Sequence, residues 1–175
     1  GEADACPHHN ILTFRVQPDE GISLRFWVKK PGQEMKLEEK EFSFDYKEAF
    51  EGAWLWARDH MKYRLDDKLF SWRWKGDSLM DTTNATDADQ DIAIALLFAY
   101  KLWGDEKYLI AAEEIISDIW ENTVISIDGK YYVLSATTKE AEYWNGYLFN
   151  PSYLSPAWYR IFEDVDDNPD HDWTQ

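Results

Sequence analysis

Three carboxylates occur at spacings of two in the segment from residue 85 to 103, which reads ATDADQDIAIALLFAYKLW. Asp87, Asp89 and Asp91 immediately precede an apolar run with helical periodicity. The free N–H groups and the dipole of a helix N-terminus stabilise anionic side chains, so capping alone accounts for one such group. Three carboxylates exceed what capping needs. Two interpretations therefore stay open: capping by Thr86 or Asp87, and a site that faces a ligand.

The same carboxylates match the opening D-x-D-x-D of an EF-hand calcium loop. The sixth loop position is Ile92, where the sharp turn requires Gly, and the twelfth is Phe98, where a bidentate Glu is required. Cys6 is the only cysteine, which excludes an internal disulfide and a CxxC metal site. We therefore expect no metal and no cofactor.

Aromatic residues are abundant, with 10 Trp, 10 Tyr and 9 Phe making up 17% of the chain. Several of them are crowded into segments that also carry Asp, Arg and Asn. This mixture is typical of sugar-binding clefts, because the C–H face of a pyranose stacks on an aromatic ring while its hydroxyls need polar partners. The alternative is that these rings fill a core.

The charge balance excludes several partners. The net charge of −16 repels phosphate backbones and anionic lipids, so we expect neither nucleic acid nor a membrane surface as a partner. No apolar run approaches the roughly 20 residues of a membrane span. The chain starts at Gly1 without a basic and apolar leader, so we expect a signal peptide to be absent or already removed. The compartment and the oligomeric state stay undetermined.

The elements that must position these residues change from strands to helices near Tyr46. Residues 10–28 show two alternating apolar runs around the turn sequence PDEG, and residues 35–44 alternate again, which predicts a small antiparallel sheet. Residues 47–63 predict a helix with one broad buried stripe. We interpret residues 64–84 as a loop.

Two further helices are predicted over residues 87–103 and 105–122, with Gly104 ending the first of them. Asp128-Gly129 predicts a β-hairpin within residues 124–134. Pro156 is suited to the first turn of a last helix that ends near Glu163. We expect the acidic tail after it to fray or to belong to a truncated element. The fold class is therefore α+β, a small N-terminal antiparallel sheet followed by helical hairpins.

The segment A-T-D-A-D-x-x-I-A-x-A-L-L-x-A-x-x-x-W resembles the signature of family 8 glycoside hydrolases. The resemblance continues through WLWARDHM, LFSWRW, YKLWGDEKYL, GKYYVLS and NPSYLSPAWYRIF, and covers about residues 51–173. It implies part of an (α/α)6 barrel with a groove for a polysaccharide, as in inverting endoglucanases, chitosanases and xylanases. A β-1,4-linked glucan or a related polysaccharide is the implied partner.

The resemblance also implies roles for individual residues. Asp87 matches a position in the central subsite that holds and helps to distort the sugar and has also been described as a catalytic carboxylate. Asp89 belongs to the same motif and is a candidate for substrate binding. Aromatic positions near the cleft match Trp74 or Trp72, and also Trp144 and Tyr153, as groups that stack on sugar or orient water. Core packing is the alternative for each of these rings.

The sequence departs from the family pattern in two places. The general acid of the family is a Glu in an S-E-G-x-x-Y-G-M segment that this sequence does not contain, and the general base lies beyond Gln175. Inversion needs both carboxyl groups. We therefore expect this chain to be incomplete as a catalyst. Members of the family are secreted or periplasmic.

Residues 10–50 show a second resemblance. NILTFRVQPDEGISLRFWVKKPG and KLEEKEFSFDYKEAF are similar to the C-terminal region of glucose-6-phosphate dehydrogenase. No glycine-rich dinucleotide loop is present, so we do not expect dehydrogenase activity. The expected domains are residues 1–46 and 47–175. Beside a hydrolase-derived region, two alternatives stay open: a non-catalytic carbohydrate-binding or structural chimera, and a module that oligomerises through the edge strands of the sheet.

Overall fold

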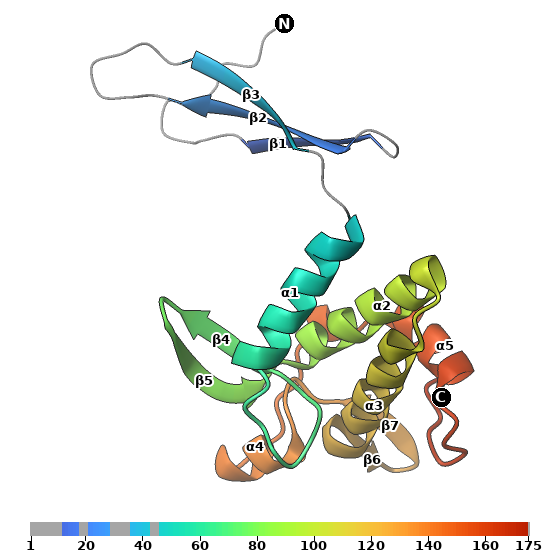
Figure 1. Ribbon diagram of the computed structural model, residues 1–175. Coiled ribbons are helices and arrows are strands. Elements are labelled where there is room, and N and C mark those ends of the chain that lie inside the picture. Colours follow the sequence, from blue (N-terminus) through green and yellow to red (C-terminus); the bar gives the residue numbers. More distant parts are fainter. Residues whose placement is uncertain (1–11, 18–20, 29–35, 43–45, 175) are drawn as a thin grey trace, which may run out of the picture. The chain divides into compact units, whose positions relative to one another are not determined.

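The N-terminal part of the chain forms a three-stranded antiparallel sheet. The computed structural model describes residues 12–17, 21–28, 36–42 and 46–174, with side chains from residue 46 onward (Figure 1). The strands are β1 (Leu12–Gln17), β2 (Gly21–Val28) and β3 (Lys36–Phe42), in the order β1-β2-β3. The predicted sheet is confirmed, while residues 18–20 of the predicted turn lie outside the described residues.

Helix α1 (Tyr46–His60) confirms the predicted change from strands to helices. The chain divides into two compact units, residues 1–53 and 54–175, with the boundary inside α1. The predicted broad buried stripe is wrong, because no residue of α1 is buried. Trp54 is half-buried and packs on Phe70 with ring centroids 5.7 Å apart, whereas Leu55 and Trp56 are exposed.

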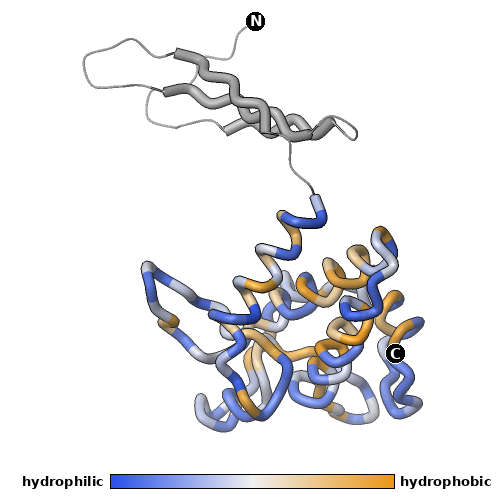
Figure 2. The backbone as a smooth tube through the Cα atoms, viewed as in Figure 1, coloured by the Kyte–Doolittle hydropathy of each residue, from blue (hydrophilic) through white to orange (hydrophobic). Residues whose placement is uncertain are grey.

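The core of the second unit is the hairpin of α2 (Thr86–Trp103) and α3 (Glu106–Thr123), as predicted. Gly104 joins the two helices in the left-handed conformation, with φ 69°, and its N–H donates to the Tyr100 carbonyl. Asp105 accepts a hydrogen bond from the Lys107 N–H as the N-cap of α3. Figure 2 shows hydrophobic residues alternating with hydrophilic ones along both helices. The buried apolar residues of the two helices are Ala93, Ile94, Leu96, Leu97, Ala99, Tyr108, Ala112, Ile115, Ile116 and Ile119.

A second hairpin lies in the segment that we interpreted as a loop. Strands β4 (Ser71–Lys75) and β5 (Ser78–Asn84) pair antiparallel around Gly76, whose φ is 61°. The register shifts twice between Ser71 and Trp74. Such bulges interrupt the regular alternation on which sequence patterns depend, which explains why the strands escaped prediction.

Five further elements follow α3 along the chain. The predicted hairpin forms as β6 (Val124–Ile127) and β7 (Lys130–Val133), with positive φ at Asp128 and Gly129. A short helix α4 (Thr138–Tyr143) and a 3-10 turn η1 (Pro151–Tyr153) follow, and neither was predicted. Helix α5 (Pro156–Val165) begins at the predicted proline and continues past Glu163.

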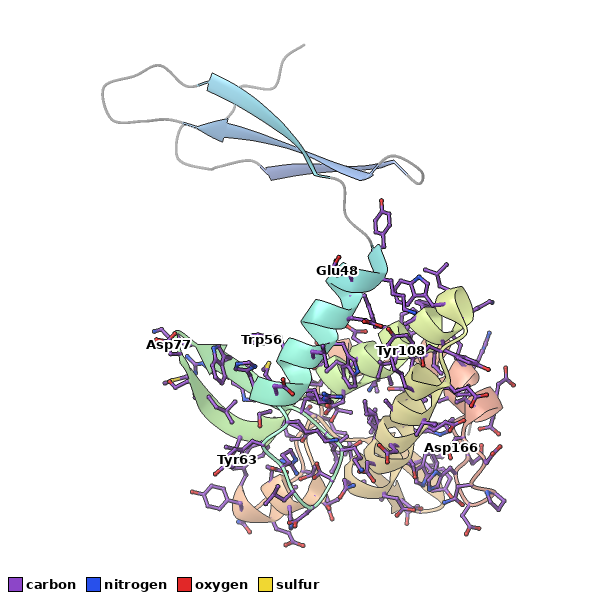
Figure 3. All side chains as sticks on the ribbon, viewed as in Figure 1. Glu48, Trp56, Tyr63, Asp77, Tyr108 and Asp166 are labelled. Carbon is purple, nitrogen blue, oxygen red and sulfur yellow. The ribbon has the colours of Figure 1, made fainter. Side chains whose placement is uncertain are left out.

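The acidic tail does not fray, in contrast to the prediction. His171 and Trp173 are buried, and the ring of Trp173 packs edge-on against Phe162 at 5.1 Å. His171 Nδ1 lies 2.7 Å from Asp166 Oδ2, and Trp173 Nε1 donates to the same oxygen at 2.9 Å. Asp166, which bonds both of these side chains, is labelled in Figure 3. The apolar surface of Trp173 thus anchors the tail although its neighbours are acidic.

The mixture of helices and small antiparallel sheets confirms the α+β class. None of the helices in the described ranges combines the length and the apolar character that a bilayer crossing requires. An (α/α)6 barrel stays a prediction from the resemblance.

Candidate functional site

A cavity of about 240 Å³ lies beside the N-terminal end of α2. We call it the α2 cleft. Its lining comes from β4, β5, the residue before α2 and the segments on both sides of α4: Trp72, Asp81, Thr83, Asn84, Ala85, Ser135, Ala136, Trp144, Leu148 and Tyr153. Three of the predicted aromatic residues, Trp72, Trp144 and Tyr153, are therefore brought together, although Trp72 lies 72 and 81 positions before the other two in the sequence (144 − 72 and 153 − 72).

Backbone hydrogen bonds hold these walls in place. The Thr86 N–H donates to the Ser135 carbonyl at 3.1 Å, and the Ser135 N–H donates to the Leu148 carbonyl at 2.8 Å. Trp144 is the C-cap of α4, and its N–H donates a hydrogen bond to the Glu140 carbonyl. Trp72 and Trp144 are 47% and 44% exposed, so part of each ring is free to contact a ligand.

Asp81 is the carboxylate of the α2 cleft, and the sequence analysis missed it. Its Oδ1 accepts hydrogen bonds from the Thr83 N–H at 3.0 Å and the Thr83 hydroxyl at 2.9 Å. The Trp72 indole N–H also donates to it, and Arg73 adds a positive charge nearby. These donors, with the Thr83 backbone first, lower the pKa of Asp81, so the group is ionised at neutral pH. The sequence did contain one indication of this arrangement: Asp81 and Thr83 have the D-x-T spacing at which an Asp side chain bonds the backbone two residues later.

Asp89 has no exposed surface and is bonded to Asn84, which lines the cleft. Its Oδ1 accepts from the Phe70 N–H at 2.8 Å, and its Oδ2 accepts from Asn84 Nδ2 at 2.9 Å. Asn84 Oδ1 in turn accepts from the Thr137 N–H at 2.9 Å. A side chain this buried does not suit the direct substrate contact predicted for Asp89. Asp89 is instead a positioning residue that joins three segments around the start of α2.

Burial dominates the electrostatics of Asp89. It raises the pKa of this carboxyl to about 7, against the opposing effect of the hydrogen bonds from Asn84 and Phe70. The group therefore changes charge in the physiological range.

Asp87 is half-buried in the first turn of α2 and does not line the α2 cleft. Its Oδ1 accepts from the N–H of the next residue, Ala88, at 2.9 Å. The N-cap of α2 is Ala85, without a side-chain cap, so neither Thr86 nor Asp87 is the N-cap residue, although Asp87 accepts one of the N–H groups of the first turn. Asp87 lies two residues beyond Ala85, which does line the cleft.

Trp74 lies apart from the other predicted aromatic residues. Its ring packs edge-on against Trp56 at 5.7 Å and His60 at 5.3 Å, and its indole donates to the Gly76 carbonyl. The register shifts in β4 break the alternation that would place residues 72 and 74 on one face. Of the two alternatives, Trp72 is the residue that lines the cleft, and Trp74 packs with α1.

A buried ion-pair network fixes the chain before β4. Arg64 Nη2 lies 2.7 Å from Asp67 Oδ2, and Arg64 Nη1 lies 2.6 Å from Glu140 Oε1. All three side chains are largely buried. Burial opposes the charge of Arg64, but the hydrogen bonds to Asp67 and Glu140 outweigh it and raise the pKa of the guanidinium. This network ties the chain before β4 to α4.

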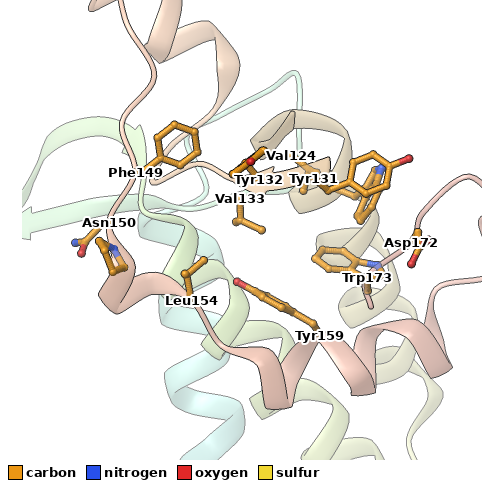
Figure 4. A pocket seen from close by; sticks show the side chains of 12 residues that line it. Val124, Tyr131, Tyr132, Val133, Phe149, Asn150, Leu154, Tyr159, Asp172 and Trp173 are labelled. Carbon is orange, nitrogen blue, oxygen red and sulfur yellow. The ribbon is translucent and has the colours of Figure 1, made fainter. Parts of the chain in front are cut away.

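A second cavity, of about 270 Å³, lies between the β6–β7 hairpin and α5 (Figure 4). Rings and aliphatic side chains dominate its lining, which includes Trp120, Tyr132, Leu154, Tyr159 and Trp173. None of the residues predicted to form the site lines this second cavity. Across the described ranges, no group of three or more His, Cys, Asp or Glu side chains is arranged to hold a metal ion.

Family comparisons match most of the chain. Residues 40–175 match the model of the glycosyl hydrolases of family 8, and residues 2–63 match the model of the C-terminal domain of glucose-6-phosphate dehydrogenase. Both resemblances in the sequence are therefore confirmed. The two matches overlap at residues 40–63.

Similar proteins are endoglucanases by name. Endoglucanase 2 of Ruminiclostridium josui is 40% identical over 108 residues, which are 57% of this chain and 22% of that protein. A crystal structure of a family 8 endoglucanase from Klebsiella pneumoniae matches with a TM-score of 0.61 and 31% identity, over 69% of this chain and 39% of that one. An endoglucanase structure from Komagataeibacter sucrofermentans matches with a TM-score of 0.62 and 29% identity, over 74% of this chain and 40% of that one. The chain thus spans well under half the length of these relatives.

Proposed function

The chain belongs to the glycosyl hydrolases of family 8, and we propose that its α2 cleft binds a β-1,4-linked glucan. The observation that carries this proposal is the gathering of Trp72, Trp144 and Tyr153 beside the ionised Asp81 in one cavity. The names of the similar endoglucanases support the class of substrate.

The cleft residues have complementary roles in this proposal. The exposed parts of Trp72 and Trp144 stack on the C–H faces of two glucose units, because such faces are apolar and flat. Asp81 accepts hydrogen bonds from sugar hydroxyls with the lone pairs that Thr83 leaves free. Tyr153, at the end of η1, offers a further donor or a further ring.

Asp87 retains a proposed place at the margin of the cleft. We propose that its carboxylate reaches a sugar that extends past Ala85 along the first turn of α2. Inverting hydrolysis uses two carboxyl groups about 6.5–9.5 Å apart. Asp81 is the single carboxylate among the described residues that line the cavity. Glycan binding is therefore the proposed activity, and hydrolysis requires a separate test.

Isothermal titration with cellohexaose tests the binding proposal. We expect saturable binding that Trp144→Ala weakens about tenfold, because the variant loses a stacking ring worth roughly 1 kcal/mol together with apolar contact area. Trp74→Ala is the matched control, since Trp74 packs with Trp56 and His60 outside the cleft, and its affinity should equal that of the parent chain. Equal losses in both variants, or no binding heat at all, would remove the α2 cleft as the glycan site.

Release of reducing ends from carboxymethyl cellulose tests hydrolysis separately. If the chain releases them, Asp87→Ala should abolish the release. Continued release by Asp87→Ala would show that the proposed catalytic role of Asp87 is wrong and would leave the binding proposal intact.

A further inference from the structure

The end of the chain places one histidine among many carboxylates. Residues 163–174 contain six Asp and Glu, no Lys or Arg, and a single histidine, His171. The His171 side chain is only 1% exposed, although the residues around it in the sequence are acidic. Protonation of His171 is therefore the one way in which this stretch of sequence gains a positive charge.

Both ring nitrogens of His171 face carboxylate oxygens. Nδ1 lies 2.7 Å from Oδ2 of Asp166, which is the C-cap of α5, and Nε2 lies 3.0 Å from Oε1 of Glu121 on α3. An imidazole donates from both nitrogens only in its charged form. A charged His171 thus connects the end of α5 to α3 through two ion pairs.

Asn168 competes with Glu121 for the same ring nitrogen. Its Nδ2 also lies 3.0 Å from His171 Nε2. Its Oδ1 accepts from the Asp170 N–H at 3.1 Å, so the amide NH₂ is the group that faces the ring. A neutral ring with its proton on Nδ1 accepts from Asn168, whereas a charged ring donates from Nε2 to Glu121. The protonation state of His171 therefore decides between the two partners.

The surroundings of the ring can accommodate both states. The His171 ring stacks on Trp120 of α3 with centroids 5.1 Å apart and an interplanar angle of 25°, an arrangement that favours a charged ring. The Glu121 side chain is 60% exposed, so it can turn into water when the ring is neutral. Two more carboxylates lie close: Glu163 of α5 accepts from the Trp173 N–H, and Asp172 is the next residue in the chain.

We propose that residues 166–174, which we call the C-terminal segment, are attached to α3 in a pH-dependent way. At acidic pH the charged His171 binds Glu121 and holds the segment on α3. At alkaline pH the neutral His171 binds Asn168 of its own segment, and the attachment to α3 is weaker. Histidine side chains change charge between about pH 5 and 8, so the change falls within the physiological range.

The attachment bears on the second cavity. Trp120 of α3 and Trp173 of the C-terminal segment both line that cavity, and their rings pack edge-on at 5.1 Å (Figure 4). Loss of the ion pair with Glu121 leaves the contacts between rings to hold this wall together. The wall should therefore be more mobile at alkaline pH.

Urea unfolding of the whole chain at pH 5.5 and pH 8 tests the proposal. Glu121→Gln should raise the unfolding equilibrium constant about threefold at pH 5.5, because it removes a partly exposed ion pair, and by less than twofold at pH 8, where the pair is already lost. Glu142→Gln, at an exposed glutamate of α4, is the matched control and should have little effect at either pH. Asp89 is the same in all three proteins, so its titration cancels when they are compared at one pH.

Backbone ¹⁵N relaxation of residues 170–174 measures the attachment itself. In the parent chain the heteronuclear NOE of these residues should fall between pH 5.5 and pH 8, and most of this fall should be absent in Glu121→Gln. Equal mobility of the parent chain at both pH values would overturn the proposal. An equal effect of Glu121→Gln on unfolding at both pH values would also overturn it, since Glu121 would then act independently of the charge of His171.

Discussion

At the scale of single residues, Asp87 and Asp89 show why a motif of alternating carboxylates is ambiguous. Positions two apart on a helix are rotated by about 200°, so the two side chains point to nearly opposite sides of α2. Asp89 is buried and bonded to Phe70 and Asn84, while Asp87 is half-buried. The motif predicted where α2 begins, but the direction of each carboxylate depends on which side of α2 is covered.

The raised pKa of Asp89 predicts a pH dependence of stability. Between the unfolded pKa of 3.8 and the folded pKa of about 7, the native state holds a proton that the unfolded state has released. The free energy of unfolding should therefore fall as pH rises from about 4 to 7, by up to about 4 kcal/mol, and stay level above that range. Urea unfolding followed by Trp fluorescence at pH 4.5, 6 and 8 measures this change.

Asp89→Asn separates Asp89 from the other titrating groups. The variant should be less stable at pH 4.5, because its new amide nitrogen then faces the Asn84 Nδ2 group, and two donors cannot bond to each other. Asn84 cannot turn its Oδ1 toward residue 89 instead, because that oxygen accepts from the Thr137 N–H. Its stability should change less than that of the parent chain between pH 4.5 and 8. An identical pH profile in both proteins would contradict the assigned pKa.

At the scale of elements, the sequence predicted α2, α3 and the β6–β7 hairpin well, since their signals are local. Gly104 and Asp128-Gly129 fix the turns through positive φ, and the helical stripes are regular. The β4–β5 hairpin, α4 and the anchored tail were missed. Their stability depends on contacts between distant positions, such as Trp173 on Phe162 and Arg64 on Glu140, which no local pattern reveals.

The Arg64 network predicts how tightly α4 is held. Arg64→Met leaves the buried carboxylates of Asp67 and Glu140 without a counter-charge, so it should lower the free energy of unfolding by about 3–5 kcal/mol. Lys139→Met is the control, because it removes only the exposed pair with Asp66 and should change stability little. Urea unfolding midpoints compare the two variants. Comparable losses would mean that the buried network does not stabilise the chain more than a surface pair does.

At the scale of the whole molecule, the chain consists of two compact units, residues 1–53 and 54–175. The α2 cleft is lined only by residues of the second unit. Residues 2–63 match a different family model from the one that covers residues 40–175. We propose that the two units are separable domains, close to the predicted boundary at residues 46 and 47.

Removal of residues 1–45 tests this separation while leaving α1 intact. The shortened chain should keep its helical circular dichroism and bind cellohexaose with the affinity of the full chain, since every residue of the α2 cleft is retained. Loss of cooperative unfolding in the shortened chain would show that the N-terminal unit is needed for the second unit to fold.

The most direct test of the account is an NMR titration of the tryptophan indole N–H groups with cellohexaose. The ten Trp residues give one indole signal each, and single Trp→Phe variants assign them. If the α2 cleft binds the glucan, the signals of Trp72 and Trp144 shift saturably while that of Trp74 stays in place. Shifts confined to Trp74 and Trp56, with Trp72 and Trp144 unmoved, would contradict the account.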